Sequence, residues 1–219
     1  MGALPQSAKA VREMVLALEE QILLGRLYPR ERLVEEQLAS QFAVSRHVVR
    51  QVLAELEGAG LLVRGAGTGV TIREYTPEDV QQLYEMRELL EAEAARRIVL
   101  PLDASALATV RALAEDYAAA VAARDMRAVI RTNKTFHQAV YSHCRNDFLF
   151  SMIDQMAQRA NLVRFSSSME LPHLERARDD HFRIVDALAG DDSDRLAAVC
   201  VAHIQPSRLH YLERRKLST

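Results

Sequence analysis

The chain lacks tryptophan, has only two cysteines among its 219 residues, and contains no long apolar run. Two cysteines, Cys144 and Cys200, are too few for a disulfide framework, and such scarcity is typical of proteins that remain in the cytoplasm. Because no stretch of about 18 consecutive apolar residues is present, no helix is expected to cross a membrane. The first residues also lack the basic and apolar regions of a secretory signal. We therefore expect a cytoplasmic protein without a membrane partner.

Glycine and proline are also scarce, with 8 and 6 residues, and this favours helix over most of the chain. An apolar content of 49% is enough to build a packed core, which excludes a disordered chain. Most of the glycines fall between Gly58 and Gly69 and mark the one strongly non-helical stretch. The composition therefore predicts a mainly α protein that is interrupted once by a glycine-rich loop.

The first third of the chain has the pattern of a winged helix-turn-helix. Apolar residues at helical spacing predict three helices, and the short sequence Ala43-Val44 separates the last two. Two β-prone runs flank the glycine-rich loop and predict a hairpin. We assign residues 1–73 to a DNA-binding domain and residues 74–76 to a linker. The expected elements are helices over 9–24, 35–42 and 45–59 and strands over 61–64 and 70–73.

Residues 77–219 are predicted to be helical throughout. Thr76 is expected to cap the first helix, and Pro77 stands at the first helical position, where proline is favoured. Breaks between helices are expected near Pro101, Asp125 and Gly190 and at two further polar or proline-containing segments. Six helices in one domain predict an all-α six- to seven-helix bundle. The expected helices cover 77–100, 103–124, 125–144, 147–168, 172–190 and 192–215.

The helix that follows the turn carries the residues best suited to read DNA. In a helix-turn-helix this helix lies in the major groove with its first residues at the base edges. Arg46 and Arg50 are four residues apart and share one face, and arginine makes bidentate bonds to guanine. Ser45 can cap the helix or bond a phosphate, His47 is exposed by the same periodicity, and the loop around Gly67 would approach the backbone. An isolated arginine pair is usually a solvated basic face, but the surrounding order of elements favours DNA contact.

The sequence RERLVEEQLASQFAVSRHVVRQVLAELEGAGLLVRGAGTGVTI resembles the DNA-binding domain of GntR-family transcriptional regulators. The resemblance covers residues 9–73 and implies that the five residues named above contact DNA. Two positions depart from the usual pattern of the family. Val48 stands where most relatives carry proline, and Gln51 stands where they carry glutamate.

The net charge of −2 does not look like that of a nucleic-acid-binding protein. Residues 1–73 carry 9 basic and 8 acidic side chains, so even this part has a charge of only +1. From Ala43 to Arg73, however, there are four arginines against two glutamates. We therefore expect few phosphate contacts and weak non-specific binding. Tight binding would require a homodimer on a pseudo-palindromic double-stranded DNA operator.

Six of the seven histidines lie in the second part of the chain. Asn133 and His137 are four residues apart on one predicted helix, while His181 and His203 belong to two later helices. Three histidines from three helices can meet inside a bundle, where metal sites are common, and imidazole suits zinc or nickel. From spacing alone the signal is weak, because histidines that simply belong to a core are more common.

Five strings in this part resemble the FCD domain, the all-helical effector domain of the FadR subfamily. In many such domains an aspartate and three histidines bind a divalent metal, so the resemblance implies that Asn133, His137, His181 and His203 are ligands. Asn133 stands where the usual pattern has aspartate, and its amide oxygen brings no negative charge to a metal. The matching strings are PEDVQQLYEMRELLEAEAARR, NKTFHQAV, RNDFL, DDHFRIVDALAGDD and LAAVCVAHI.

A metal with open positions would attract a carboxylate, which arginines in the same cavity would also bind. The candidates are Arg87, Arg131 and Arg164. The alternative for each is an ion pair on the surface. Glu91 lies four residues after Arg87 and could form such a pair with it along one helix. We therefore expect a ligand-responsive transcriptional regulator that acts as a repressor and senses a small organic acid, with no enzymatic activity.

Two other functions stay open at this point. A metal-dependent enzyme acting on a small metabolite is disfavoured because no motif such as H-E-x-x-H is present, although Asp179 and Asp180 directly precede His181. The other hypothesis is a DNA-binding regulator whose helical domain serves only for dimerisation.

Overall fold

The computed structural model describes residues 6–65, 69–167 and 170–216, and the chain divides into two compact units after Thr76. Within the described residues, no helix is long and apolar enough to cross a membrane. The mainly α fold predicted from the sequence is confirmed, with a small sheet confined to the first unit.

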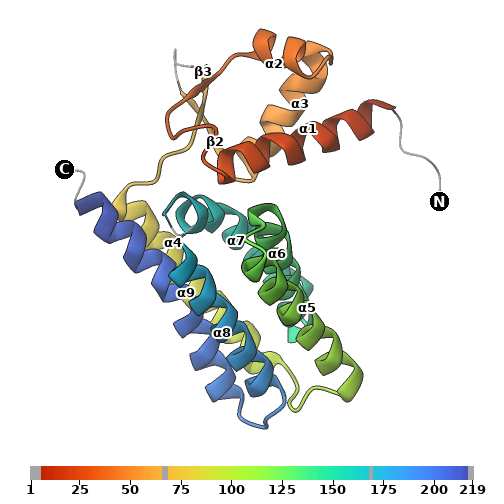
Figure 1. Cartoon of the computed structure of the whole chain (residues 1–219), viewed down its shortest axis with the longest axis vertical. Helices are drawn as coiled ribbons and strands as arrows, with labels where there is room; N and C mark the ends of the chain where they lie inside the picture. The colour runs from red at the N-terminus through yellow and green to blue at the C-terminus, as the bar shows by residue number, and fades with distance from the viewer. Residues whose placement is uncertain (1–5, 66–68, 168–169, 217–219) are drawn as a thin grey trace. The chain divides into compact units, whose positions relative to one another are not determined.

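In the first unit, α3 is the central helix. One face of α3 is buried, and α1 and α2 both pack against this helix (Figure 1). The buried residues of α3 recur at intervals of three and four, which is the spacing of one helical face. They are Val48, Val49, Val52, Leu53 and Leu56. The helices of this unit are α1 (Gln6–Leu23), α2 (Glu35–Gln41) and α3 (Arg46–Gly58).

The predicted hairpin is present, and the structure adds one strand to it. Strands β2 (Leu62–Gly65) and β3 (Gly69–Ile72) are antiparallel, and β1 (Arg32–Leu33) pairs with the other edge of β3. Strand β1 was not predicted from the sequence, which indicated only a connector there. A strand of two residues is too short to show the alternation of apolar and polar side chains. Gly67, predicted to approach DNA, lies outside the described residues.

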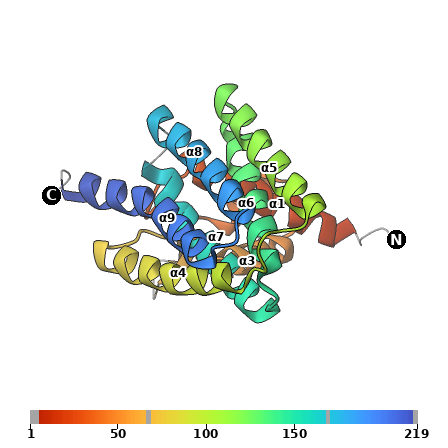
Figure 2. The same ribbon diagram turned by 90° about the horizontal axis from the view of Figure 1, so that it is seen from below.

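The second unit is a helical bundle. In Figure 1 and Figure 2, α9 runs beside α4 and α8; α5 packs against α6 and α8, and α7 packs against α4. The helices are α4 (Pro77–Arg97), α5 (Ala104–Ala122), α6 (Met126–Tyr141), α7 (Asp147–Ser167), α8 (Leu171–Leu188) and α9 (Ser193–Lys216), with one 3-10 turn, η1 (Ser142–Cys144).

The bounds of these helices differ from the predicted ones for local reasons. Helix α4 ends at Arg97 rather than at the predicted Leu100. Leu100 directly precedes Pro101, and the helical conformation is disfavoured for a residue before proline. After α6 the chain tightens into η1 and then turns at Arg145, whose φ of 56° is left-handed. Helix α9 continues through Pro206, in agreement with the continuous helix predicted over 192–215.

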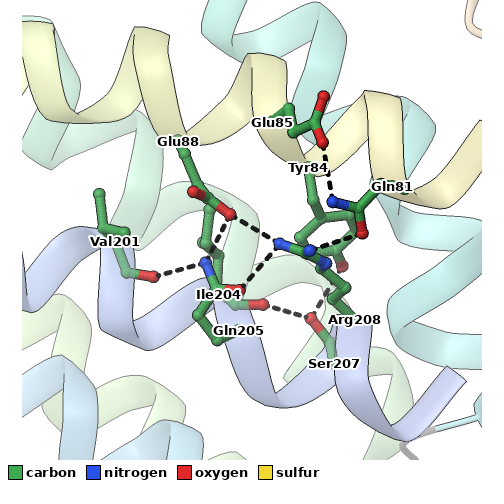
Figure 3. A network of polar contacts seen from close by, with 9 residues as sticks. All are labelled: Gln81, Tyr84, Glu85, Glu88, Val201, Ile204, Gln205, Ser207 and Arg208. Atoms are coloured by element: carbon green, nitrogen blue, oxygen red, sulfur yellow. Dashed lines mark hydrogen bonds and ion pairs between the residues drawn. The ribbon is translucent and has the colours of Figure 1, made fainter. Parts of the chain in front are cut away.

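Polar contacts fix α4 against α9 (Figure 3). The Arg208 guanidinium donates to the Glu88 carboxylate at 2.8 Å and to the side-chain oxygen of Gln81. The hydroxyls of Tyr84 and Ser207 lie 2.8 Å apart. These long-range contacts set the register of α4, which begins directly after the segment 74–76.

The interior of the bundle is partly polar. Its apolar core brings together side chains from most of the helices, including Phe136, Ile184 and Leu196. Beside this core lie eight polar or charged residues that are almost inaccessible to water: Arg87, Glu91, Asn133, His137, Asn161, Asp180, His181 and His203. Such residues are seldom fully buried unless they are paired or bind a ligand, so this cluster is the candidate site.

Candidate functional site

Three helices each contribute one histidine to the buried cluster. His137 comes from α6, His181 from α8 and His203 from α9. The Nε2 atoms of His137 and His203 lie 3.1 Å apart, and the three rings offer ligating nitrogens within 4.8 Å of one another. The structure therefore brings together the three histidines that the sequence predicts as metal ligands.

His181 is enclosed by aromatic rings. Phe136 stacks on it at a centroid distance of 4.0 Å, and Tyr117 tilts against it at 4.5 Å. Among the described residues, neither ring nitrogen of His181 has a hydrogen-bond partner. An unpaired buried polar group costs about 1–3 kcal/mol, so this ring is poorly explained by core packing alone.

The three imidazoles are kept neutral by their surroundings. Burial lowers the pKa of His137 and of His181 well below the usual value, and the neighbouring His203 ring adds to both effects. Burial also lowers the pKa of His203, although attraction from the Asp180 carboxylate opposes it. Neutral imidazoles have a free nitrogen lone pair, which is the form that binds metal.

Asp180 supports the cluster from one side. Its carboxylate accepts a hydrogen bond from Arg183 at 2.7 Å, and its other oxygen lies 3.7 Å from Nδ1 of His203. Burial raises the pKa of Asp180, but His203 and Arg183 outweigh this and bring it below the usual value. The carboxylate is therefore placed to orient the His203 ring, as carboxylates near metal-binding histidines do.

Two of the three candidate arginines lie in the same interior. Arg87 is only 2% exposed and forms an ion pair with Glu91 at 2.9 Å, and the second oxygen of Glu91 accepts a hydrogen bond from Tyr141. Burial lowers the pKa of Arg87, but attraction to Glu91 outweighs it and raises this pKa. Burial, followed by repulsion from Arg87, lowers the pKa of Arg164. Two guanidiniums therefore lie close together beside the histidines.

The third candidate, Arg131, lies elsewhere. It is exposed on α6 and lines a depression between α5 and α6 with Asp116 and Thr135. The structure does not bring it together with the histidines, so it is an unsuitable candidate for binding the same ligand.

Two small cavities meet at the cluster. One has a volume of about 40 Å³ and is lined in part by His203 and Asp180; the other, of about 30 Å³, is lined in part by His137. Asn133 and Arg164 line both. Each cavity has room for an ion or a water molecule, so a larger ligand requires side chains to move.

Several residues of these walls were not predicted from the sequence, and Asn161 and Tyr117 are two of them. Asn161, which lines the second cavity, lies one helical turn before Arg164 on α7, so helical spacing already placed it on the same face. Tyr117, from α5, lines the first cavity, and no local pattern in its alanine-rich helix marks it.

In the first unit, the predicted DNA-reading residues lie at the start of α3. The Ser45 hydroxyl accepts a hydrogen bond from the Val48 backbone N–H at 3.3 Å, which makes Ser45 the N-cap. The side chains of Arg46 and Arg50 are 62% and 67% exposed, and His47 is exposed beside them. These side chains are accessible to a large partner such as DNA.

Comparisons with known proteins assign both units. Residues 10–72 match the gntR family of bacterial regulatory proteins, and residues 82–206 match the FCD domain. The chain belongs to the GntR family and carries an FCD domain. The family assigns it as a DNA-binding transcriptional regulator with an effector domain.

Several relatives support this assignment. The Nta operon transcriptional regulator of Aminobacter aminovorans is 28% identical over 81% of this chain and 82% of its own. The regulator McbR of Escherichia coli is 29% identical over 64% of this chain and 63% of its own. The solved structure of E. coli McbR/YncC covers 98% of this chain and 100% of its own with a TM-score of 0.77; at 22% identity it shows a shared fold.

The GntR assignment favours a regulator over an enzyme, since the relatives named above are transcriptional regulators. It also confirms the order of a winged helix-turn-helix followed by a helical FCD domain. Metal binding and the roles of individual residues stay predictions.

The buried histidines predict a dependence of stability on pH. Their pKa values are lower in the folded protein than the usual value of about 6.5, so the unfolded chain takes up protons that the folded chain does not. Stability is then lost as the pH falls below about 6.5. In metal-free protein, His181→Phe should reduce the slope of unfolding free energy against pH, by up to about 1.4 kcal/mol per pH unit.

Urea unfolding between about pH 5 and pH 7 measures this slope. The exposed and non-titrating Gln155, changed to Ala, provides a control in the same unit, and its slope should match that of the wild type. A slope in His181→Phe equal to that of the wild type would contradict the placement of a neutral His181 in the core.

Proposed function

We propose that this GntR-family regulator is a metal-dependent sensor of a small organic acid. The observation that carries the proposal is a cluster of three buried, neutral imidazoles beside the buried guanidinium of Arg87 and the partly buried side chain of Arg164. Such a site offers nitrogen ligands to a cation and positive charge to an anion. Binding of the acid would shift the protein between states with different affinity for DNA.

The donors fit a divalent metal. Both nitrogens of His181 are buried without a partner in the described structure, and the Nε2 atoms of His137 and His203 face each other. These three residues would hold zinc or nickel, and the Asn133 amide oxygen would be a fourth ligand. When bound, the metal would supply a positive charge that attracts a carboxylate.

The acid would also contact the arginines of the interior. The Nη1 atom of Arg87 is buried and has no hydrogen-bond partner among the described residues. Arg164 lines both cavities next to the histidines. A carboxylate near these groups would relieve their mutual repulsion, and charge-assisted hydrogen bonds of this kind are strong. Arg131 has no part in this proposal, because it lies outside these cavities.

The DNA-binding domain (residues 1–73) would be joined by the linker 74–76 to the ligand-binding and dimerisation domain (77–219). Arg46 and Arg50 would read bases, with Ser45, His47 and the loop around Gly67 assisting. We propose a homodimer that binds a pseudo-palindromic operator and represses transcription. A ligand that weakens DNA binding must itself bind the DNA complex more weakly.

Exposed apolar side chains support the dimer. Helices α4 and α7 pack against each other and together expose Leu89, Phe148 and Met152 to solvent. Contiguous patches of exposed apolar side chains are typical of protein–protein interfaces, and exposed residues on two adjacent helices can form one.

The metal proposal predicts opposite effects for two substitutions. His181→Ala should lower zinc or nickel affinity at least tenfold, because it removes a ligand. Asn133→Asp should raise affinity, because it adds a negative charge beside the cation. Isothermal titration of metal-free protein measures both, with His143→Gln as the control. Equal affinity in all four proteins would rule out metal binding at the cluster.

The ligand proposal predicts that small carboxylates stabilise the metal-loaded protein. A panel that includes citrate, lactate and succinate should contain an acid that raises the melting temperature of the wild type. The same acid should raise the melting temperature of Arg164→Gln very little, because the carboxylate of the acid has lost a cationic partner in this variant. If no acid of the panel shifts either protein, while metal binds, the bundle does not sense this class of ligand.

The DNA proposal predicts that Arg46→Ala and Arg50→Ala each weaken binding to a duplex selected by the wild type from a random library. Losing one bidentate guanine contact costs about 1–3 kcal/mol, which is roughly 5- to 150-fold in affinity. Fluorescence anisotropy measures the loss, and Arg12→Ala, an exposed change on α1, is the control. Analytical ultracentrifugation of the same samples should show dimers. Wild-type affinity in both α3 variants would exclude them from base contact.

A further inference from the structure

Both arginines proposed to read DNA form ion pairs inside their own domain. Nη2 of Arg46 lies 2.9 Å from Oε1 of Glu36, and Nε of Arg50 lies 2.9 Å from Oε2 of Glu35. The two glutamates are consecutive and form the first turn of α2. Each arginine on the outer face of α3 therefore has a carboxylate of its own.

A similar pair lies beside the wing. Nε of Arg64, on β2, lies 3.5 Å from a carboxylate oxygen of Glu57 near the end of α3. Arg64 is one of the four arginines between Ala43 and Arg73, and Arg46 and Arg50 are two others. These internal pairs explain why a DNA-binding domain has a net charge of only +1.

The pairs are weak enough to be exchanged. All four side chains of the two α2–α3 pairs are at least partly exposed, from 32% for Glu35 to 78% for Glu36. Exposed ion pairs change an equilibrium by only about 1.4- to 5-fold. A DNA phosphate is another exposed anion, so an arginine that leaves its glutamate for a phosphate gains little.

A guanine edge is a better partner than either anion. A bidentate arginine–guanine contact discriminates by roughly 5- to 150-fold, which exceeds the strength of an exposed pair. The glutamates therefore hold the arginines against phosphates, whereas the correct bases displace them.

We propose that Glu35 and Glu36 compete with DNA phosphates for Arg50 and Arg46, so that both arginines stay paired on wrong sequences and are released only to the correct bases. The inference rests on the proposed role of the two arginines in reading DNA. It adds that carboxylates of α2 keep the arginines of α3 from binding the phosphates of wrong sequences.

The test uses the full chain with Glu35→Gln, Glu36→Gln and the double variant. On a duplex of random sequence, the double variant should bind about tenfold more tightly than the wild type. Its plot of log affinity against log salt concentration should be steeper by about 2 per subunit, since each released arginine adds about 0.9. Affinity for the selected operator should rise at least as much, because the wild type has to break both pairs there.

Glu13→Gln is the matched control. Glu13 lies on α1 and faces Lys9 at 3.8 Å, so this variant has the same change in net charge and leaves both arginines paired. Its salt dependence on random DNA should stay near that of the wild type. If Glu13→Gln matches Glu36→Gln, net charge alone explains the effect and the proposal is overturned.

A double-mutant cycle tests whether Glu36 acts through Arg46. In an Arg46→Ala background, Glu36→Gln should have no further effect on binding to random DNA; additive effects would overturn the proposal. Thermal unfolding shows whether each variant is folded. If the arginine variants lose operator binding but the glutamine variants behave as wild type, the inference fails while the DNA-reading assignment stands.

Discussion

The interior of the helical bundle has to hold charged and polar side chains where a small helical domain would normally pack apolar ones. The charge of Arg87 is neutralised by Glu91, which also accepts a hydrogen bond from the hydroxyl of Tyr141. Buried polar contacts therefore join α4 to α6. The histidines bring α6, α8 and α9 to the same point. Helices whose contacts include such groups cannot shift freely, because an uncompensated buried charge is costly. The arrangement of the bundle therefore depends on the same groups that form the site.

Each unit contains an arginine–glutamate ion pair, and the two pairs differ in burial and therefore in role. Arg87 and Glu91 are both about 2% exposed, and removing either would leave a charge stranded in a low-dielectric interior. Arg46 and Glu36 are separated by the same 2.9 Å but lie in solvent, where water replaces either partner easily. Burial thus makes one pair part of the architecture, and exposure leaves the other available for exchange with DNA. Neither role is evident from the residue types.

Much of the site was predictable from the sequence, and the failures have physical causes. Asn133 and His137 are one turn apart, so their shared face follows from helical geometry. Arg131 lies two residues before Asn133, about 200° away around the helix, and helical periodicity already opposed its place in the cavity. The pairing of β1 was missed because its partner, β3, lies far along the chain.

By itself, the sequence determined the order of helices, the hairpin and the family, because these depend on periodicity, turn residues and motifs within short stretches. It also determined that histidines from three helices were available. Only the tertiary structure decided that their rings meet, that Arg87 and Arg164 lie beside them while Arg131 does not, and that Glu35 and Glu36 reach the arginines of α3. Those outcomes depend on packing between segments distant in the chain, where small shifts of a helix decide whether side chains touch.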